Sequence, residues 1–428
     1  MNVMNFSDLD ISEEIKGAIG EMGFDKLTPI QELTLPHTLG GIDLIGQAQT
    51  GSGKTIAFGI PVVEKVFIPD KSPQAIILCP TRELCMQVAS EIEKLASKIK
   101  KFKVLAVYGG QPIGKQTRVL KKGVHVVVGT PGRVIDHIER GNLDLIGVER
   151  VVLDEADEML EMGFREDIET ILKNTPHQRQ TLLFSATIPS EITQIAQKYQ
   201  KNPKFIKVSD KRENIPKITQ YAFKCKIKDK FDALTRVIDA YNVNLALIFC
   251  NTKKSVDYVA KHLKKLDFSV DSLHGDMTQK TRDKVMNKFK NGNIDILVAT
   301  DVAARGLDIE NVDVIVNYDV PQNHDDYVHR IGRTARAGKT GFAFMLVSRD
   351  EISRFNNIRK ANNTKIIEKE LPTPEKVEYI KNKRILDNAL RLSKNENLDG
   401  YVNVIKENSS AEDYLKIAAC FLKMMREK

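Results

Sequence analysis

A glycine-rich segment, Ala48-Gln49-Thr50-Gly51-Ser52-Gly53-Lys54-Thr55, most constrains the fold, because it lies between a short apolar run and a helical stretch. Its glycines let backbone N–H groups approach phosphate oxygens, and the following helix N-terminus adds a favourable dipole. Lys54 supplies a charge for the β- and γ-phosphates, and Thr55 supplies a hydroxyl ligand for Mg²⁺. Ala48 replaces the usual first glycine of this pattern, but the Gly-Ser-Gly-Lys-Thr core remains. The segment predicts a phosphate loop between the short apolar segment Asp43–Ile45 and a helix that begins at about Ile56.

An acidic tetrapeptide, Asp154-Glu155-Ala156-Asp157, ends the apolar run Val151–Leu153, which predicts a buried strand. Two adjacent carboxylates at the carboxyl end of such a strand suit Mg²⁺ and the activation of a water molecule. Alone, the tetrapeptide could equally be the acidic start of a helix. The phosphate loop elsewhere in the chain favours a nucleotide site built from both segments.

Short continuous apolar runs alternate with helical stretches twice along the chain. Such runs are typical of parallel strands buried on both faces, and the helices between them imply βαβ units. The polar, proline-ended segment before residue 217 is typical of a linker. We therefore expect an α/β protein with two parallel-sheet domains and a cleft between them. The expected ranges are 1–207 for the first domain, 208–217 for the linker, 218–370 for the second domain and 371–428 for a helical extension.

The extension 371–428 shows helix signals and no strand signal. Thr373-Pro374-Glu375 is typical of a helix start, and a later segment carries an apolar face at helical spacing. That face consists of Leu415, Ala418, Ala419, Leu422 and Met425. Two interpretations remain open: a helical pair packed on the second domain, or a surface for self-association.

Composition narrows the class of partner. The 428 residues carry a net charge of +8 and give a pI of about 9.0, which favours a polyanionic partner. The absence of Trp and an aromatic content of 6% argue against recognition of many stacked bases. No signal-peptide pattern or long apolar run indicates a membrane partner. The five cysteines, which form no C-x-x-C pair, predict free thiols and a reducing, cytoplasmic location; they are Cys79, Cys85, Cys225, Cys250 and Cys420.

Further motifs follow in a fixed order. They are Gly23–Gln31, Pro80–Leu84, Gly109-Gly110, Thr130–Arg133, Ser185–Thr187, Phe249–Thr252, Ala299–Asp308 and His329–Arg336. Together with the phosphate loop and the acidic tetrapeptide, they make the chain resemble the DEAD-box RNA helicases over residues 6–347. The resemblance implies two tandem RecA-like domains and the cofactors ATP and Mg²⁺.

The resemblance also implies roles at the nucleotide. Gln31 is expected to read the adenine edge, because an amide both donates and accepts hydrogen bonds, and Phe24 is expected to stack on the ring. The loop Ala48–Thr55 would hold the phosphates, with Gly306 and Asp308 facing the nucleotide. Asp154 would position Mg²⁺, partly through water, and Glu155 would orient or deprotonate the attacking water. Arg333 and Arg336, from the second domain, would reach the γ-phosphate only when the domains close.

Other motif residues are expected to bind RNA or to couple hydrolysis to unwinding. Candidate contacts to the RNA backbone are Thr81, Arg82, Gly110, Thr130, Arg133, Thr252 and Thr300. Candidate coupling residues are Asp157, Ser185, Thr187, His329 and Arg330. The spacing of Arg330, Arg333 and Arg336 predicts three side chains that project in roughly one direction from a helical turn.

The expected activity is ATP-dependent, local and non-processive unwinding of RNA without sequence preference, since backbone contacts carry no base code. Two alternatives are a DNA helicase or translocase with the same core, and a scaffold that clamps RNA without turnover. Expected partners are RNA, a second copy of the chain through 371–428, and proteins of RNA decay or ribosome assembly.

Overall fold

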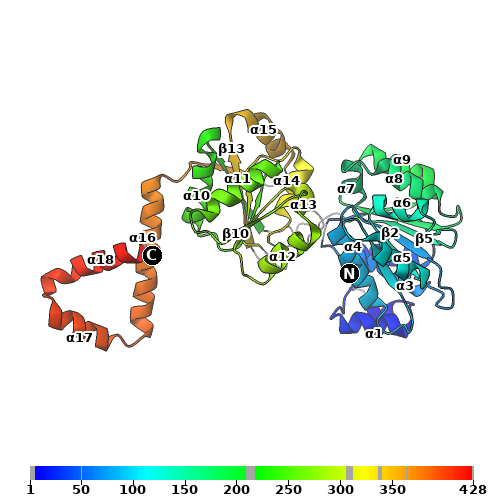
Figure 1. Cartoon of the computed structure of the whole chain (residues 1–428), viewed down its shortest axis with the longest axis horizontal. Helices are drawn as coiled ribbons and strands as arrows, with labels where there is room; N and C mark the ends of the chain where they lie inside the picture. The colour runs from blue at the N-terminus through cyan, green and yellow to red at the C-terminus, as the bar shows by residue number, and fades with distance from the viewer. Residues whose placement is uncertain are drawn as a thin grey trace. The chain divides into compact units, whose positions relative to one another are not determined.

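The computed structural model describes residues 5–49, 51–208, 217–304, 312–335, 340–362 and 365–426. The chain folds into two compact units that divide mainly between residues 215 and 216, within the range expected to be a linker. Each of the two units is an α/β structure with one parallel sheet, as predicted (Figure 1). None of the helices among the described residues is long and apolar enough to span a membrane.

The first unit contains a seven-stranded sheet in the order β3-β4-β2-β5-β6-β1-β7, and every pairing is parallel. Its strands are β1 Leu44–Gln47, β2 Ala75–Leu78, β3 Val104–Val107, β4 Val126–Gly129, β5 Arg150–Leu153, β6 Gln180–Ser185 and β7 Lys204–Lys207. Its helices are η1 Phe6–Asp8, α1 Glu13–Glu21, α2 Pro29–Leu39, α3 Lys54–Glu64, α4 Arg82–Leu95, α5 Ile113–Lys121, α6 Pro131–Glu139, α7 Ala156–Glu161, α8 Arg165–Lys173 and α9 Ser190–Tyr199.

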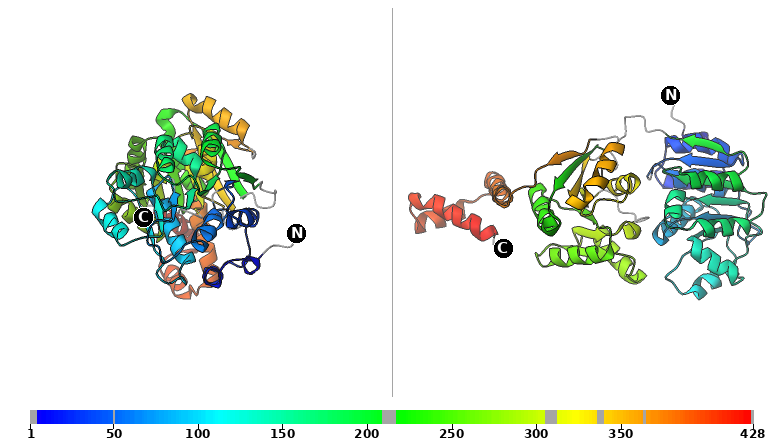
Figure 2. Two further views of the ribbon diagram at one scale, coloured as in Figure 1. Left: turned by 90° about the vertical axis from the view of Figure 1, so that its right-hand side faces the viewer. Right: turned by 90° about the horizontal axis from the view of Figure 1, so that it is seen from above.

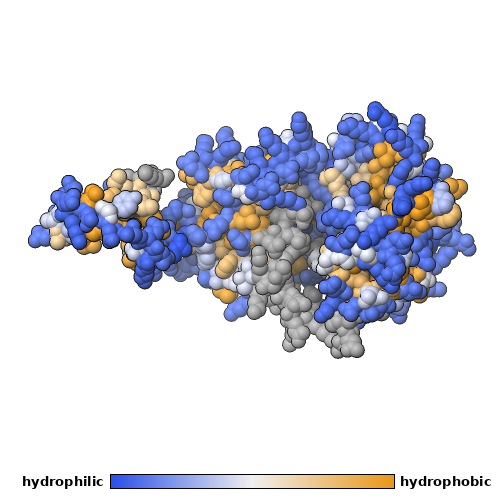
Figure 3. Space-filling model, turned by 90° about the horizontal axis from the view of Figure 1, so that it is seen from below, coloured by the Kyte–Doolittle hydropathy of each residue, from blue (hydrophilic) through white to orange (hydrophobic). Residues whose placement is uncertain are grey.

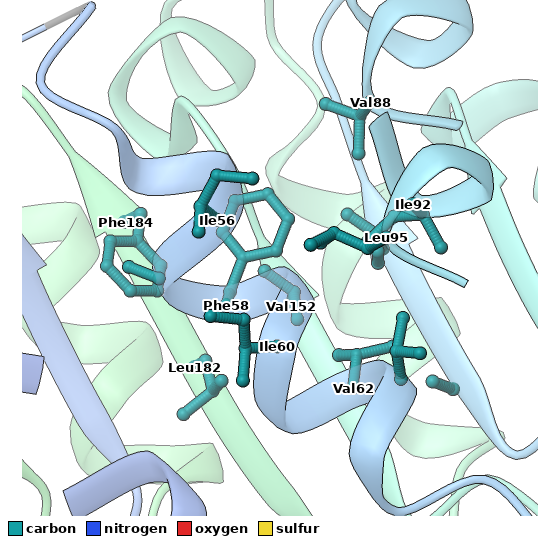
Figure 4. Close-up of a cluster of buried hydrophobic side chains, with 14 of the residues drawn as sticks. Ile56, Phe58, Ile60, Val62, Val88, Ile92, Leu95, Val152, Leu182 and Phe184 are labelled. Carbon is teal, nitrogen blue, oxygen red and sulfur yellow. The ribbon is translucent and has the colours of Figure 1, made fainter. Parts of the chain in front are cut away.

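Both faces of this sheet are buried, which explains the continuous apolar runs. Along β2, Ala75 and Ile77 join the core beneath α1 to α4, whereas Ile76 and Leu78 join the core beneath α6 to α9. Figure 4 shows the first of these cores, where side chains of α3 and α4 meet those of β5 and β6. Because successive strand residues point to opposite faces, the central strands β2 and β4 are buried at every position and need side chains that suit the core throughout.

The second unit is again a sheet covered by helices (Figure 2). Its strands are parallel and follow the order β10-β11-β9-β12-β13-β8-β14. Its strands are β8 Lys217–Lys224, β9 Ala246–Phe249, β10 Val270–Leu273, β11 Ile296–Ala299, β12 Val314–Asn317, β13 Thr340–Val347 and β14 Ile367–Lys369. Its helices are η3 Ile227–Asp229, α10 Lys230–Tyr241, α11 Lys253–Lys264, α12 Gln279–Lys290, α13 Asp301–Ala304, α14 His324–Ile331, η4 Arg349–Glu351 and α15 Ile352–Ala361.

The extension is helical and has one helix more than the sequence suggested. It consists of α16 Pro374–Asn395, α17 Asp399–Asn408, η5 Ala411–Asp413 and α18 Tyr414–Arg426. The start of α16 packs on α10: Lys381 Nζ lies 2.6 Å from Asp239, and Arg384 donates to the Ala240 oxygen at 3.0 Å. The first interpretation of the extension therefore holds for α16, which anchors it to the second unit.

Candidate nucleotide and RNA site

The phosphate loop leaves β1 and ends at the N-terminus of α3, as its sequence predicts. Gly51 and Gly53 have φ angles of 76° and 91°, a left-handed backbone that glycine adopts without strain. Lys54 is buried at the first position of α3, and its Nζ donates to the Ala48 oxygen at 3.2 Å. Thr50 lies outside the described residues. The described part of the loop thus places backbone amides and one ammonium group at the start of a helix.

Gln31 lies directly against this loop. Its Oε1 accepts from the Thr28 N–H at 2.8 Å, and its Nε2 donates to the Gly53 oxygen at 3.0 Å. A Cβ atom at position 53 would approach Gln31 Nε2 to 2.5 Å, which gives a second reason for glycine there. An amide oxygen accepts twice and an amide nitrogen donates twice, so Gln31 keeps one bond of each kind for a ligand. Phe24, the expected stacking partner, is 44% exposed.

Asp154 and Glu155 follow β5 and are both buried. Burial raises the pKa of Asp154 to about 7; Lys54 opposes this shift and Glu155 adds to it. Glu155 has φ 50° and ψ 51°, a left-handed conformation that costs a non-glycine residue about 1 kcal/mol. Its Oε2 is buried and has no hydrogen-bond partner among the described residues. A strained backbone and an unpaired buried carboxylate oxygen are features of a functional position.

Asp154 and the phosphate loop suit Mg²⁺ that is bound together with a nucleotide, rather than a metal centre built from protein ligands alone. Among the residues that the structure describes, no three His, Cys, Asp or Glu side chains form a metal-binding group. Mg²⁺ commonly keeps several waters and takes one or two carboxylates together with substrate phosphates. Asp154 beside the phosphate loop meets that requirement.

Asp157 connects the acidic segment to the segment after β6. Its Oδ2 accepts from the Thr187 N–H at 2.8 Å and from the Thr187 hydroxyl at 2.9 Å. The Asp157 N–H donates to Ser185 Oγ at 3.2 Å. The structure thus brings together Asp157, Ser185 and Thr187, three of the candidate coupling residues.

Gln47, which the sequence analysis missed, joins the phosphate loop to the same segment. Its Nε2 donates to the Ala186 oxygen at 3.1 Å, and the Ala48 N–H donates to the Ser185 oxygen at 3.0 Å. The pairing of β1 with β6 puts these residues side by side. Nothing in the sequence around Gln47 marks it, because its partner lies 139 positions away.

The candidate RNA contacts of the first unit follow β2, β3 and β4 at the same edge of the sheet. Thr81 is the N-cap of α4, and its hydroxyl accepts from the Leu84 N–H at 3.3 Å. Gly110 has φ 83°, and a Cβ there would lie 2.1 Å from Arg82 Nη1, so the arginine packs on its backbone. Thr130 precedes α6 as its N-cap, and Arg133 donates to the Gln111 oxygen at 3.1 Å. The carboxyl edge of a parallel sheet is where α/β proteins bind ligands.

The second unit places its candidates at strand ends as well. Thr252 follows β9 and caps α11 by accepting from the Ser255 N–H at 3.1 Å. Thr300 follows β11, and His329 lies within α14. Gly306, Asp308 and Arg336 lie outside the described residues.

Of the three arginines expected on one helical turn, Arg330 lies in the helix α14 and Arg333 follows its end. The helix α14 ends at Ile331, with Gly332 as its C-cap, so Arg333 lies beyond it. The chain turns there because Thr334 bridges to Val312, and its hydroxyl donates to the Val312 oxygen at 2.5 Å. Ala335, which replaces the family's usual glycine, has a left-handed φ of 58°.

Arg330 is buried among other motifs rather than presented to a ligand. Only 1% of Arg330 is exposed. Its Nε and Nη2 each donate a hydrogen bond of 2.6 Å to the Asp301 carboxylate. It also donates to Asn251 at 2.8 Å, to Asn317 at 3.1 Å and to the Asp319 oxygen at 2.9 Å. Arg330 therefore holds three motif-bearing segments together from within the domain.

Arg330→Met is expected to destabilise the protein by about 3–5 kcal/mol, because it leaves buried polar partners without their cation. Urea unfolding of the full chain measures this. The matched control is Arg359→Met, which removes a half-exposed pair with Glu368 and should cost less than about 1 kcal/mol. Equal losses in the two variants would contradict the assigned role of Arg330.

Comparison with known proteins identifies the family. Residues 28–195 match the DEAD/DEAH box helicase model, and residues 229–338 match the helicase conserved C-terminal domain. The DEAD-box ATP-dependent RNA helicase CshA of Geobacillus kaustophilus is 47% identical over 420 residues, which cover 98% of this chain and 90% of the relative. CshA of Bacillus subtilis is 44% identical over 421 residues, 98% of this chain and 85% of the relative.

Two solved structures show the same fold. S. cerevisiae Dbp5 bound to RNA and ADP BeF3 is 32% identical with a TM-score of 0.77, covering 88% of this chain and 98% of that one. Mss116p bound to ssRNA and AMP-PNP is 30% identical with a TM-score of 0.78, covering 92% and 87%. The expected pair of RecA-like domains is confirmed. With motifs, fold and identity in agreement along almost the whole chain, it belongs to the DEAD-box ATP-dependent RNA helicases.

Proposed function

We propose that the chain binds ATP with Mg²⁺ at the carboxyl edge of its first sheet and couples hydrolysis to local, non-processive unwinding of RNA. The contact between Asp157 and Thr187 carries the proposal, since it joins the acidic segment to the segment after β6. The phosphate loop and the candidate RNA-backbone loops follow other strands of that sheet. A conformational change in the acidic segment after β5 can therefore reach the segment after β6 through direct hydrogen bonds.

The nucleotide roles follow from the chemistry of each group. Lys54 would meet the β- and γ-phosphates, while Thr55 and Asp154 would hold Mg²⁺, Asp154 partly through water. Bound Mg²⁺ would neutralise charge that develops on the phosphates. Glu155 would orient or deprotonate the attacking water, and its unpaired Oε2 is positioned by the same strained backbone. Arg333 and Arg336 remain the proposed γ-phosphate contacts from the second unit.

The proposed RNA contacts use hydroxyls, backbone amides and arginine forks, which bind phosphate without reading bases. Strand displacement tests the activity. Because opening a base-pair step costs about 1.4 kcal/mol, a duplex of about 8 base pairs should separate with ATP, whereas one of about 25 should not. Equal rates for both lengths would contradict local unwinding. Intact ATP hydrolysis without any separation would instead favour the clamping scaffold.

We further propose that the extension 371–428 joins two copies of the chain. Its helices expose large apolar side chains, and Figure 3 shows hydrophobic atoms at their surface. These side chains are Leu386, Leu390, Tyr401, Leu415, Phe421, Met424 and Met425. Ile417, Phe421 and Met424 also line a hollow that the end of α17 shares with α18. Exposed apolar patches of this kind mark protein interfaces.

Removal of residues 372–428 is expected to convert a dimer into a monomer, because the exposed apolar faces of α17 and α18 go with them. Sedimentation velocity of the full chain and of a 1–371 truncation measures the change in mass. If the full chain sediments as a monomer at the same concentration, the extension has another role.

We propose a cytoplasmic setting from the state of the cysteines. All five cysteines are free in the structure, three of them buried, which is typical of a reducing cytoplasm. Proteins of RNA decay or ribosome assembly are the proposed partners. Crosslinking of RNA in cells would identify the substrates and so decide between these pathways.

A further inference from the structure

One buried amide, Gln116 in α5, joins the loop after β3 to the start of α6. Its Nε2 donates to the Tyr108 oxygen at 3.0 Å; its Oε1 accepts from Arg133 Nη1 at 3.1 Å and lies 2.9 Å from His137 Nε2. Only 4% of Gln116 is exposed, so these bonds replace its contacts with water. A single side chain thus ties three segments of the first unit together.

The partners fix the orientation of the amide and the tautomer of His137. An arginine only donates and a backbone oxygen only accepts, so Oε1 faces Arg133 and Nε2 faces Tyr108. Because Oε1 also accepts from His137, the proton of that imidazole lies on Nε2. Burial lowers the pKa of His137, and Arg133 shifts it in the same direction. The network therefore has one hydrogen-bonding pattern with a neutral histidine.

The same network holds Arg133 through two of the three nitrogens of its guanidinium. Nη1 donates to Gln116 and to the Gln111 oxygen, each at 3.1 Å, and Nε lies 3.5 Å from Asp136. Nη2 has no hydrogen bond to any residue that the structure describes. An arginine held at Nη1 and Nε presents the N–H groups of its Nη2 in a defined direction, as a phosphate contact requires.

We propose that Gln116 is a positioning residue for RNA binding. It holds Arg133 and the loop Tyr108–Gln111, which contains Gly110, in the arrangement that meets the RNA backbone. The inference rests on the proposed function, because Gly110 and Arg133 are proposed RNA contacts. Gln116 is too deeply buried to touch RNA, so its effect passes through these two positions.

The test replaces Gln116 with methionine, which has a similar size but forms no comparable hydrogen bonds. The matched control is Gln74→Met. Gln74 is 5% exposed and also makes three side-chain hydrogen bonds, to Phe67 and Asp70, but it lies before β2, at the opposite edge of the sheet. Gln116→Met should raise the Kd and the KM for single-stranded RNA about tenfold. Its kcat at saturating RNA should stay within about twofold of wild type.

Gln74→Met should lower the thermal stability about as much as Gln116→Met does, but it should leave the Kd for RNA unchanged. A wild-type Kd in Gln116→Met, or an equal rise in Gln74→Met, would overturn the positioning role. Arg133→Ala separates this outcome from failure of the proposed contacts: if its Kd is also unchanged, the contact assignment itself is wrong. Should Gln116→Met not fold, Gln116→Asn, whose amide is one methylene shorter, should raise the Kd about threefold; no rise would contradict the proposal.

Discussion

Lys54→Ala is expected to lower RNA-stimulated ATP hydrolysis by at least about a thousandfold, the upper range for removal of one preorganised donor. Lys54 is buried at the N-terminus of α3, where its ammonium and the helix dipole would act on the same phosphates. A steady-state assay at saturating ATP and RNA measures the loss. Among the residues that the structure describes, the substitution removes one side-chain hydrogen bond, to the Ala48 oxygen, so the domain should stay folded.

Lys65→Ala is the matched control, because Lys65 is the exposed C-cap of the same helix. It should hydrolyse ATP at the wild-type rate and give the baseline for loss of a lysine charge. Wild-type hydrolysis in Lys54→Ala would defeat the assignment of the phosphate loop and, with it, the placement of the nucleotide at this sheet edge.

Glu155→Gln is expected to lower hydrolysis by about 10²–10⁴-fold while ATP and RNA still bind, since the carboxylate proposed to activate the water is lost and Asp154 remains. Glutamine has the same shape and can occupy the buried, left-handed position of Glu155. The complex with ATP and RNA should therefore persist, and RNA should dissociate far more slowly than from wild type. A fluorescent RNA chased with unlabelled RNA in the presence of ATP reports this rate.

Glu158→Gln provides the comparison for Glu155→Gln. Glu158 is a buried carboxylate on the same short helix, and it has no assigned role in hydrolysis. Its variant should release RNA at the wild-type rate. Rapid release from Glu155→Gln as well would show that another group activates the water.

Most of the fold could be predicted because a parallel strand buried on both faces needs apolar residues throughout. The strand β5, for example, was expected from the apolar run Val151–Leu153. The strand β1 was foreseen only as a short apolar segment, since Gly46 interrupts it where a Cβ would lie 2.7 Å from the Phe184 ring. The edge strand β14 was missed because its three residues are exposed and carry no apolar run.

Site residues could be predicted where a suitable side chain stands at the end of a predicted strand. They could not be predicted where contacts with distant segments determine the role of the residue. Motif residues at strand ends meet at one sheet edge because parallel strands share a direction, and Asp157 does contact Thr187. Spacing could not reveal that Arg330 faces inward, since its partners Asp301 and Asn251 come from other segments. Gln116 escaped notice for the same reason.

The central claim is that RNA, bound through its backbone, switches on ATP hydrolysis at the Lys54 and Glu155 site. The most direct measurement is the rate of ATP hydrolysis by the full chain with single-stranded RNA and with single-stranded DNA of the same sequence, each at saturation. We predict strong stimulation by RNA, little by DNA, and none by either in Lys54→Ala. Equal stimulation by DNA would contradict the account and favour a DNA helicase or translocase with the same core.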